Sequence, residues 1–206
     1  GNSLSGVSIN LEFISANPTG PLHLGHTRWA AVGDALGRVL AAAGAKVTQE
    51  FYINDRGNQM DLFGASVEAA ALGLPIPENG YQGEYIGDLA KTLVAQDKSI
   101  LELVGQARTT EFRERAYKLQ LAQQQGVLET FHTHFDVWFS ERTLHESGAV
   151  EHGMDKLRKQ GHAFELEDAT WLRTTDYGDD KDRVLIKSDG SYTYFSSDTA
   201  YYINKR

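Results

Sequence analysis

The first side chains along this sequence that could do chemistry are two histidines in the string His23, Leu24, Gly25, His26. At a spacing of three they share one face of a helix, and the residues that follow them have a helical pattern. The free N–H groups and the dipole at a helix N-terminus favour phosphate. Imidazoles placed there can donate hydrogen bonds to a triphosphate, and Gly25 would let a flat base approach the backbone. Two histidines that simply cap a helix would give the same string, so both interpretations stay open.

The elements that position this string are a strand, a helix and a second strand. Residues 7–13 alternate between apolar and polar, which predicts a strand with Glu12 on its solvent-facing side. Apolar residues recur at steps of three and four over 30–43, with Gly44 where a helix-ending glycine belongs. The second strand is expected over 46–53. This order predicts a parallel crossover unit, with ligands beyond the carboxyl end of the first strand.

The rest of the chain has a different character. A helical pattern runs from about residue 61 to 150 and predicts an insertion packed beside the sheet. Residues 171–194 predict short strands and turns, and 198–205 predict the beginning of a helix. Because the chain ends before that helix has run a usual length, we expect the fold to continue beyond it. The apolar stripe of the long helical stretch is expected to contain Phe112, Ala116, Leu119, Ala122, Leu128, Phe131 and Phe135.

Three blocks of the sequence resemble the arginyl-tRNA synthetases, which are class I aminoacyl-tRNA synthetases. The first block is 12–26, which contains the histidine string; the second comprises 28–34 and 51–59; the third is 192–198. A chance match of all three in this order is not expected. The resemblance implies an α/β fold with an incomplete, Rossmann-like parallel sheet of the nucleotidyl-transferase type and a largely helical insertion.

The resemblance also implies a division of the chain. Residues 5–60 correspond to the first half of the Rossmann-like catalytic fold with the histidine motif. Residues 61–190 correspond to the mainly helical insertion, the connective peptide, and 191–206 to the start of the second half of the catalytic fold. The lysine-bearing loop that grips pyrophosphate and the helical anticodon-binding domain of the family are not recognised in this sequence. The chain alone is therefore expected to be inactive or nearly so.

Members of the family activate arginine with ATP, release pyrophosphate and transfer the arginyl group to tRNA(Arg). By resemblance, His23 and His26 are the catalytic pair and contact the ATP phosphates, with Gly25 beneath the adenine. Mg²⁺ is expected to accompany ATP.

The resemblance implies an arginine pocket built from both ends of the chain. Ser15 and Asn17 would hold the amino and carboxylate ends of arginine. Glu12, Tyr194 and Asp198 would surround its guanidinium, which stays charged and presents a rigid fork of donors to carboxylate and phenolic oxygens. From the residues alone, two alternatives stay open: Asp198 could only cap the last helix, and Tyr194 could be a core aromatic residue.

The composition argues against several classes of protein. The formal charge of −8 and pI near 5.3 do not suit a protein that coats nucleic acid. No stretch approaches the roughly 20 apolar residues of a membrane helix. The absence of cysteine excludes disulfides and thiolate chemistry and fits a cytoplasmic location. The spacing of the histidines matches no metal-ligand pattern, so we expect no metal site in the protein.

Alternative functions remain. The chain could be an arginine- or nucleotide-binding paralogue without tRNA aminoacylation, or a noncatalytic scaffold whose helical insertion binds a partner. Arg113, Arg115 and Lys118 lie beside glutamates, which is typical of a solvated helix face, although they could contact tRNA. An incomplete sheet also predicts an exposed strand edge through which the chain self-associates.

Overall fold

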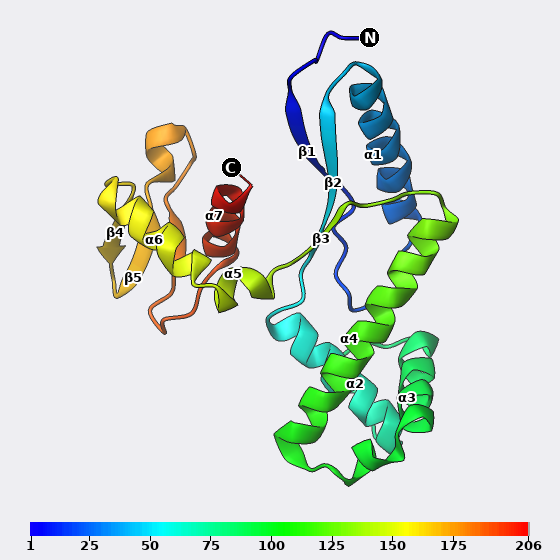
Figure 1. Ribbon diagram of the computed structural model, residues 1–206. Helices are drawn as coiled ribbons and strands as arrows, with labels where there is room; N and C mark the ends of the chain where they lie inside the picture. The colour runs from blue at the N-terminus through cyan, green and yellow to red at the C-terminus, as the bar shows by residue number, and fades with distance from the viewer. Residues whose placement is uncertain (206) are drawn as a thin grey trace. The chain divides into compact units, whose positions relative to one another are not determined.

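The computed structural model describes residues 1–205, which form two compact units, 1–139 and 140–205. Figure 1 shows the path of the chain through both. The ranges 5–60, 61–190 and 191–206 implied by the resemblance follow a different division and stay a proposal. The last residue of the third range, number 206, lies outside the described residues.

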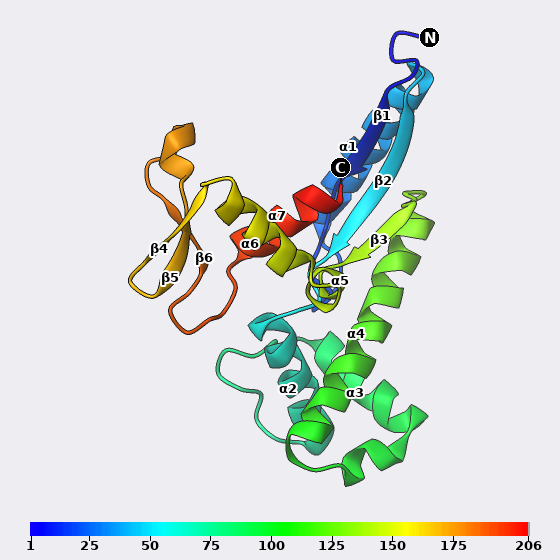
Figure 2. The ribbon, with the colours of Figure 1, turned by 60° about the vertical axis from the view of Figure 1, so that its left-hand side comes forward.

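The first unit contains a sheet with the strand order β1-β2-β3. β1 (Ser8–Glu12) and β2 (Lys46–Ile53) are parallel, and α1 (Leu24–Ala42) connects them. The chain returns to the sheet much later as β3 (Val137–Ser140). Figure 2 shows α1 lying alongside β1 and β2. The predicted α/β class with a parallel crossover is confirmed.

Small residues let α1 approach the sheet closely. Ala30, Gly33 and Gly37 are the buried residues of this helix. A Cβ atom at Gly33 would overlap the ring of Phe13, the buried residue that follows β1. The close fit between helix and strand therefore depends on the missing side chain at this position.

A second face of α1 is apolar but exposed. Trp29, Val32, Leu36 and Val39 are 58%, 52%, 44% and 64% exposed. The periodic pattern correctly predicted the helix, but the buried contacts come from its smallest residues and not from these larger ones. Since β1 is an edge strand of the sheet, the first unit has an open strand edge as well as this exposed apolar face.

Three helices form the second core of the first unit. They are α2 (Asn58–Leu72), α3 (Glu84–Gln96) and α4 (Gly105–Thr130), with the short 3-10 helix η1 (Lys98–Glu102) between the last two. Their shared core consists of Met60, Phe63, Val67, Ile86, Ala90, Leu93, Ile100, Phe112 and Ala116.

The buried stripe of α4 differs from the predicted one. Ala122, expected in the stripe, is exposed. A step of four residues keeps one helix face toward the interior, and along α4 that step passes through two glutamines. The buried residues of the helix are Phe112, Ala116, Gln120, Gln124 and Leu128.

The second unit combines an antiparallel sheet, in the order β4-β5-β6, with three α-helices and one short 3-10 helix. Its elements are α5 (Arg142–Glu146), α6 (Ala149–Lys159), β4 (Ala163–Leu166), β5 (Ala169–Leu172), η2 (Thr174–Tyr177), β6 (Arg183–Ile186) and α7 (Tyr194–Asn204).

None of the helices within residues 1–205 is long and apolar enough to cross a bilayer.

The last helix begins four residues earlier than the sequence predicted. Thr193 is its N-cap residue, and contacts with β6 fix it there. The Thr193 amide donates to the carbonyl of Leu185 at 2.9 Å, and its hydroxyl donates to the carbonyl of Val184 at 2.6 Å. The start of α7 is therefore set by a neighbouring strand and not by a local capping pattern.

We predict that Gly33→Ala destabilises the chain by about 1–3 kcal/mol, because the added methyl group overpacks the contact with Phe13. Urea unfolding at equilibrium measures the change. Gly87→Ala in α3 is the matched control, since nothing lies within 4 Å of its added Cβ. The control should be neutral or gain up to about 1 kcal/mol from helix propensity. Equal stability changes in the two variants would contradict the proposed packing.

Candidate functional site

The turn after β1 carries two residues in the left-handed backbone region. Ile14 has φ 68° and Ser15 has φ 48°, which is uncommon for residues other than glycine. The Ser15 hydroxyl donates to Oε1 of Glu12 at 3.0 Å and accepts the backbone N–H of Tyr52 at 3.1 Å. Backbone strain of this kind persists where its surroundings hold it, and it is frequent at functional sites.

Glu12 and Ser15 also line one cavity, of about 330 Å³, between the end of β1 and α1. Its other wall includes the side chains of Trp29, Val32 and Leu36. The volume lies at the small end of the range for ligand pockets, and one carboxylate against an apolar wall suits a small cation with an aliphatic stem.

The loop from Asn17 to Gly20 is held by the helical part of the first unit. Gln124 of α4 donates from Nε2 to the carbonyl of Asn17 at 3.0 Å and to the carbonyl of Gly20 at 2.7 Å. The hydroxyl of Tyr85 in α3 donates to the carbonyl of Thr19 at 2.9 Å. Burial, with a smaller contribution from Tyr81, raises the pKa of Tyr85 to about 12, so this phenol keeps the proton that it donates.

The side chain of Asn17 is tethered as well. Its Nδ2 donates to Oε1 of Gln59 in α2, which leaves the side-chain oxygen Oδ1 of Asn17 and the second Nδ2–H for other contacts. No sequence pattern predicted Gln59, Tyr85 and Gln124 as supports of this loop. The one signal for Gln124 was a polar residue at a core position of the α4 stripe.

The two histidines cap α1 reciprocally. His23 is the N-cap residue, and its Nδ1 accepts the N–H of Gly25 at 3.1 Å. Nδ1 of His26 accepts the N–H of His23 at 3.1 Å, and the two rings stack with centroids 3.7 Å apart. The capping interpretation left open by the sequence is therefore confirmed.

This cap also determines what the imidazoles can offer to a ligand. Because both Nδ1 atoms accept backbone hydrogens, each neutral ring carries its proton on Nε2. Partial burial, with the nearby charge of His23 as a smaller cause, lowers the pKa of His26. The N-terminus of α1 thus presents two Nε2–H donors, while the N–H groups of Gly25, His26 and Thr27 are already bonded to His23 within the cap.

Gly25 has a structural reason to be glycine. A Cβ atom at this position would lie 2.9 Å from Cε1 of the His23 ring. Any side chain here would push the ring away from the cap, so Gly25 is needed for the donor arrangement itself.

Tyr194 and Asp198 lie one helical turn apart on α7, in the second unit. Both are exposed, Tyr194 at 68%. A core role for Tyr194 and a capping role for Asp198 are therefore both wrong, since Thr193 is the cap. The buried face of the same helix consists of Ser196, Ser197, Ala200 and Tyr201.

The arginines of α4 are paired with carboxylates. Arg113 contacts Asp61 at 2.6 Å, and Arg115 contacts Glu111 at 2.6 Å and Asp97 at 2.9 Å. These pairs fit the predicted solvated helix face. Among residues 1–205, no group of three or more His, Cys, Asp or Glu side chains could hold a metal ion.

The chain is similar to known proteins over almost its whole length. Residues 6–206 match the family model described as tRNA synthetases class I (R), catalytic domain. The arginine–tRNA ligase of Renibacterium salmoninarum is 56% identical over 99% of this chain, and that of Micrococcus luteus is 51% identical over all of it. The chain spans 37% of the length of each of these relatives.

Solved structures give the same result. An arginyl-tRNA synthetase structure from Campylobacter jejuni matches 98% of this chain and 45% of its own, with a TM-score of 0.90 and 35% identity. The Thermus thermophilus arginyl-tRNA synthetase matches 96% of the chain and 35% of its own with a TM-score of 0.69; at 24% identity it supports the fold alone.

We predict that the free energy of unfolding decreases as the pH falls below 6.5, the ordinary pKa of histidine. Because the folded state lowers the pKa of His26, the unfolded state takes up the proton first. This contribution is complete above pH 6.5 and is lost as the pH falls through the lower folded pKa. Urea unfolding at a series of pH values measures the slope.

His26→Asn is the control for this pH dependence. The Asn side-chain oxygen can accept the His23 N–H but does not titrate. The variant should therefore show a shallower loss of stability with acid than the unmodified chain. Identical slopes would show that His26 does not contribute to the pH dependence.

Proposed function

The chain belongs to the catalytic-domain family of the class I (R) tRNA synthetases, and we propose that the protein containing it activates arginine with ATP and ligates it to tRNA(Arg). In the first step a carboxylate oxygen of arginine attacks the α-phosphorus of ATP, and pyrophosphate leaves. In the second, a ribose hydroxyl of the tRNA attacks the arginyl carbonyl carbon, loses its proton, and AMP leaves. The reciprocal histidine cap at the start of α1, the helix that forms one wall of the cavity of Glu12, is the observation that carries this proposal.

The ATP phosphates are assigned to the N-terminus of α1. His23 and His26 would donate from Nε2, since their Nδ1 atoms are used by the cap. These donors are held before the ligand arrives, so they can stabilise charge that develops on the phosphates and on the leaving pyrophosphate without reorganisation. Gly25 would lie beneath the adenine. Mg²⁺ would accompany ATP as part of the substrate.

The arginine amino and carboxylate groups are assigned to the turn after β1. The Ser15 hydroxyl donates its proton to Glu12 and accepts the N–H of Tyr52 with one lone pair, so its second lone pair remains for the ammonium group. Besides its contact with Gln59, the side-chain amide of Asn17 retains its oxygen Oδ1 and one N–H of Nδ2. Glu12 supplies negative charge to the same cavity, where it would pair with the guanidinium.

Tyr194 and Asp198 are assigned to the guanidinium as well. Their spacing of four places a phenolic oxygen and a carboxylate on one exposed face of α7. A planar, permanently charged fork of N–H donors can use both kinds of acceptor, whereas a lysine ammonium would fit this pair less specifically. We place the reaction in the cytoplasm, where tRNA is charged for protein synthesis.

We predict that Asp198→Asn raises KM for arginine about 10- to 150-fold, since hydrogen bonds to charged groups are worth about 1.5–3 kcal/mol. The measurement is arginine-dependent exchange of pyrophosphate into ATP, with and without tRNA, by the complete gene product. KM for ATP should change little.

Asp155→Asn is the matched control, because Asp155 is an exposed aspartate of α6 outside the assigned site. It should leave both KM values unchanged. Arginine-dependent exchange without transfer of arginine to tRNA would favour the paralogue alternative. Absence of both activities and of arginine binding by calorimetry would refute the proposed function.

We also propose that the 206-residue chain self-associates through the edge of β1. Support comes from the position of β1 at the edge of its sheet and from the exposed apolar side chains of α1, with Trp29 and Val39 58% and 64% exposed. Pairing of two copies would cover both features.

The predicted result is a dimer or larger species in sedimentation velocity, which Val32→Glu combined with Val39→Glu converts to monomer. Val104→Glu places the same charge at a valine that is 76% exposed but lies outside α1, and should not change the association state. A chain that stays monomeric at all concentrations would contradict this proposal.

A further inference from the structure

A buried polar cluster in the second unit connects α5 to α7. Nε2 of His145 lies 3.2 Å from Oγ of Ser197 and 3.8 Å from Oε1 of Glu141. The side chains of His145 and Glu141 are 11% and 7% exposed, and Ser197 is 4% exposed. The cluster uses none of the residues assigned above to ATP or arginine.

Separating buried polar side chains from one another costs free energy. A carboxylate removed from water requires a partner, and a buried hydroxyl or imidazole without a hydrogen bond also costs free energy. Glu141 directly precedes α5 and His145 lies in its last turn, so the carboxylate lies beside the imidazole that contacts Ser197. The contact therefore fixes α5 against the first turn of α7.

Ser197 immediately precedes Asp198 on a helix that turns about 100° per residue. A contact that fixes the direction of Ser197 therefore fixes the direction of Asp198 and, one turn earlier, of Tyr194. Ser196 makes a second contact of this kind, because its hydroxyl donates to the carbonyl of Leu185 in β6. Together these two serines set the rotation of α7 about its axis.

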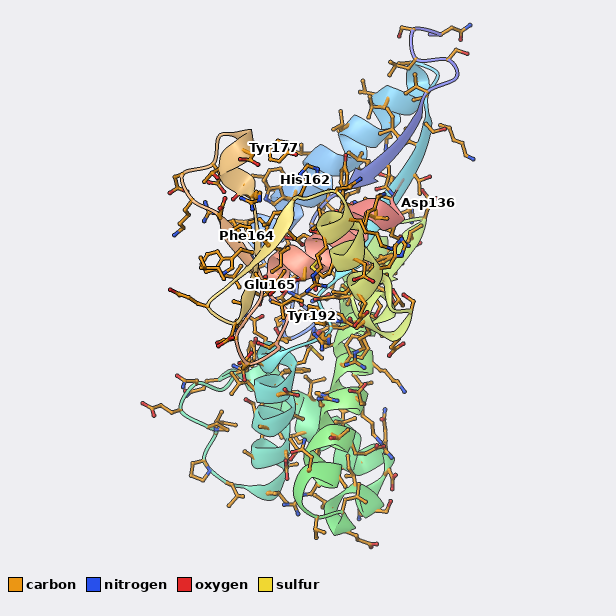
Figure 3. The ribbon with its side chains drawn as sticks, turned by 90° about the vertical axis from the view of Figure 1, so that its left-hand side faces the viewer. Asp136, His162, Phe164, Glu165, Tyr177 and Tyr192 are labelled. Carbon is orange, nitrogen blue, oxygen red and sulfur yellow. The ribbon has the colours of Figure 1, made fainter. Side chains whose placement is uncertain are left out.

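The ring of His145 also packs beside the connection that leads into α7. Its centroid lies 5.9 Å from that of Tyr192, whose hydroxyl donates to Oε1 of Glu151 at 3.1 Å. Tyr192, labelled in Figure 3, lies two residues before the helix starts. His145 thus contacts both the entry to α7 and its buried face.

We propose that His145, supported by Glu141, is a positioning residue for arginine recognition: through Ser197 it sets the direction in which α7 presents Tyr194 and Asp198. This inference rests on the proposed role of those two residues in binding arginine. His145 itself need not touch a substrate.

The test is steady-state pyrophosphate exchange by the complete gene product that carries His145→Leu. Leucine is similar in size to histidine but cannot make the hydrogen bond to Ser197. KM for arginine should rise about 10- to 100-fold, as expected for misplaced contacts. KM for ATP should stay within about threefold, because the assigned phosphate donors lie on α1. His145→Gln should restore much of the arginine affinity, since its amide can reach the serine hydroxyl.

Ser197→Ala removes the other side of the same contact and decides the question if His145→Leu does not fold. It should raise KM for arginine by a similar factor. Combining it with His145→Leu should raise KM for arginine no further than the single variant with the higher KM, because both changes remove the same contact. A purely structural role predicts instead a lower melting temperature with both KM values unchanged, which would overturn the inference.

His162→Leu is the matched control. His162 also bonds a hydroxyl, that of Tyr177 at 3.1 Å, but its partner belongs to η2 and not to α7 (Figure 3). This variant should leave KM for arginine unchanged, and an equal rise in both variants would overturn the inference. If the unmodified protein shows neither arginine-dependent exchange in the presence of tRNA, nor transfer of arginine to tRNA, nor arginine binding, the proposed function itself fails; if it is active and His145→Leu matches it, only the positioning role fails.

Discussion

The loop after β1 must leave the sheet, cross buried space and begin α1, and its carbonyl groups need donors along that path. Gln124 supplies them to Asn17 and Gly20 from a position more than 100 residues later in the chain. A buried carbonyl without a partner would cost more free energy than one hydrogen bond normally contributes. The long middle helix is therefore part of the support for the site.

At the start of α1, helix capping and ligand binding use different atoms of the same side chains. The Nδ1 atoms of His23 and His26 satisfy backbone donors, and this assigns the remaining proton of each ring to Nε2. The two interpretations of the histidine string are thus compatible: the cap orients the donors that the proposed phosphate contacts require. Gly25 leaves space for the cap, a reason separate from any approach of an adenine base.

The second unit achieves a similar result with buried polar contacts. Residues of β6 and α5 hold the first turn of α7 through Thr193, Ser196 and Ser197. Directional hydrogen bonds define the rotation of a short helix more narrowly than apolar packing does, because a rotated helix would leave them unsatisfied. The exposed face that carries Asp198 follows from contacts on the opposite face.

The sequence by itself determined the features that depend on neighbours in the chain. The alternation through Glu12 gave β1, the steps of three and four gave α1, and the histidine string placed a helix start. Only the tertiary structure revealed that Gln124 holds the loop, that α7 begins at Tyr194, and that large residues of α1 such as Val32 are exposed. Local periodicity reports which residues share a face, but the partner of that face comes from distant segments, and no local pattern encodes which segments meet.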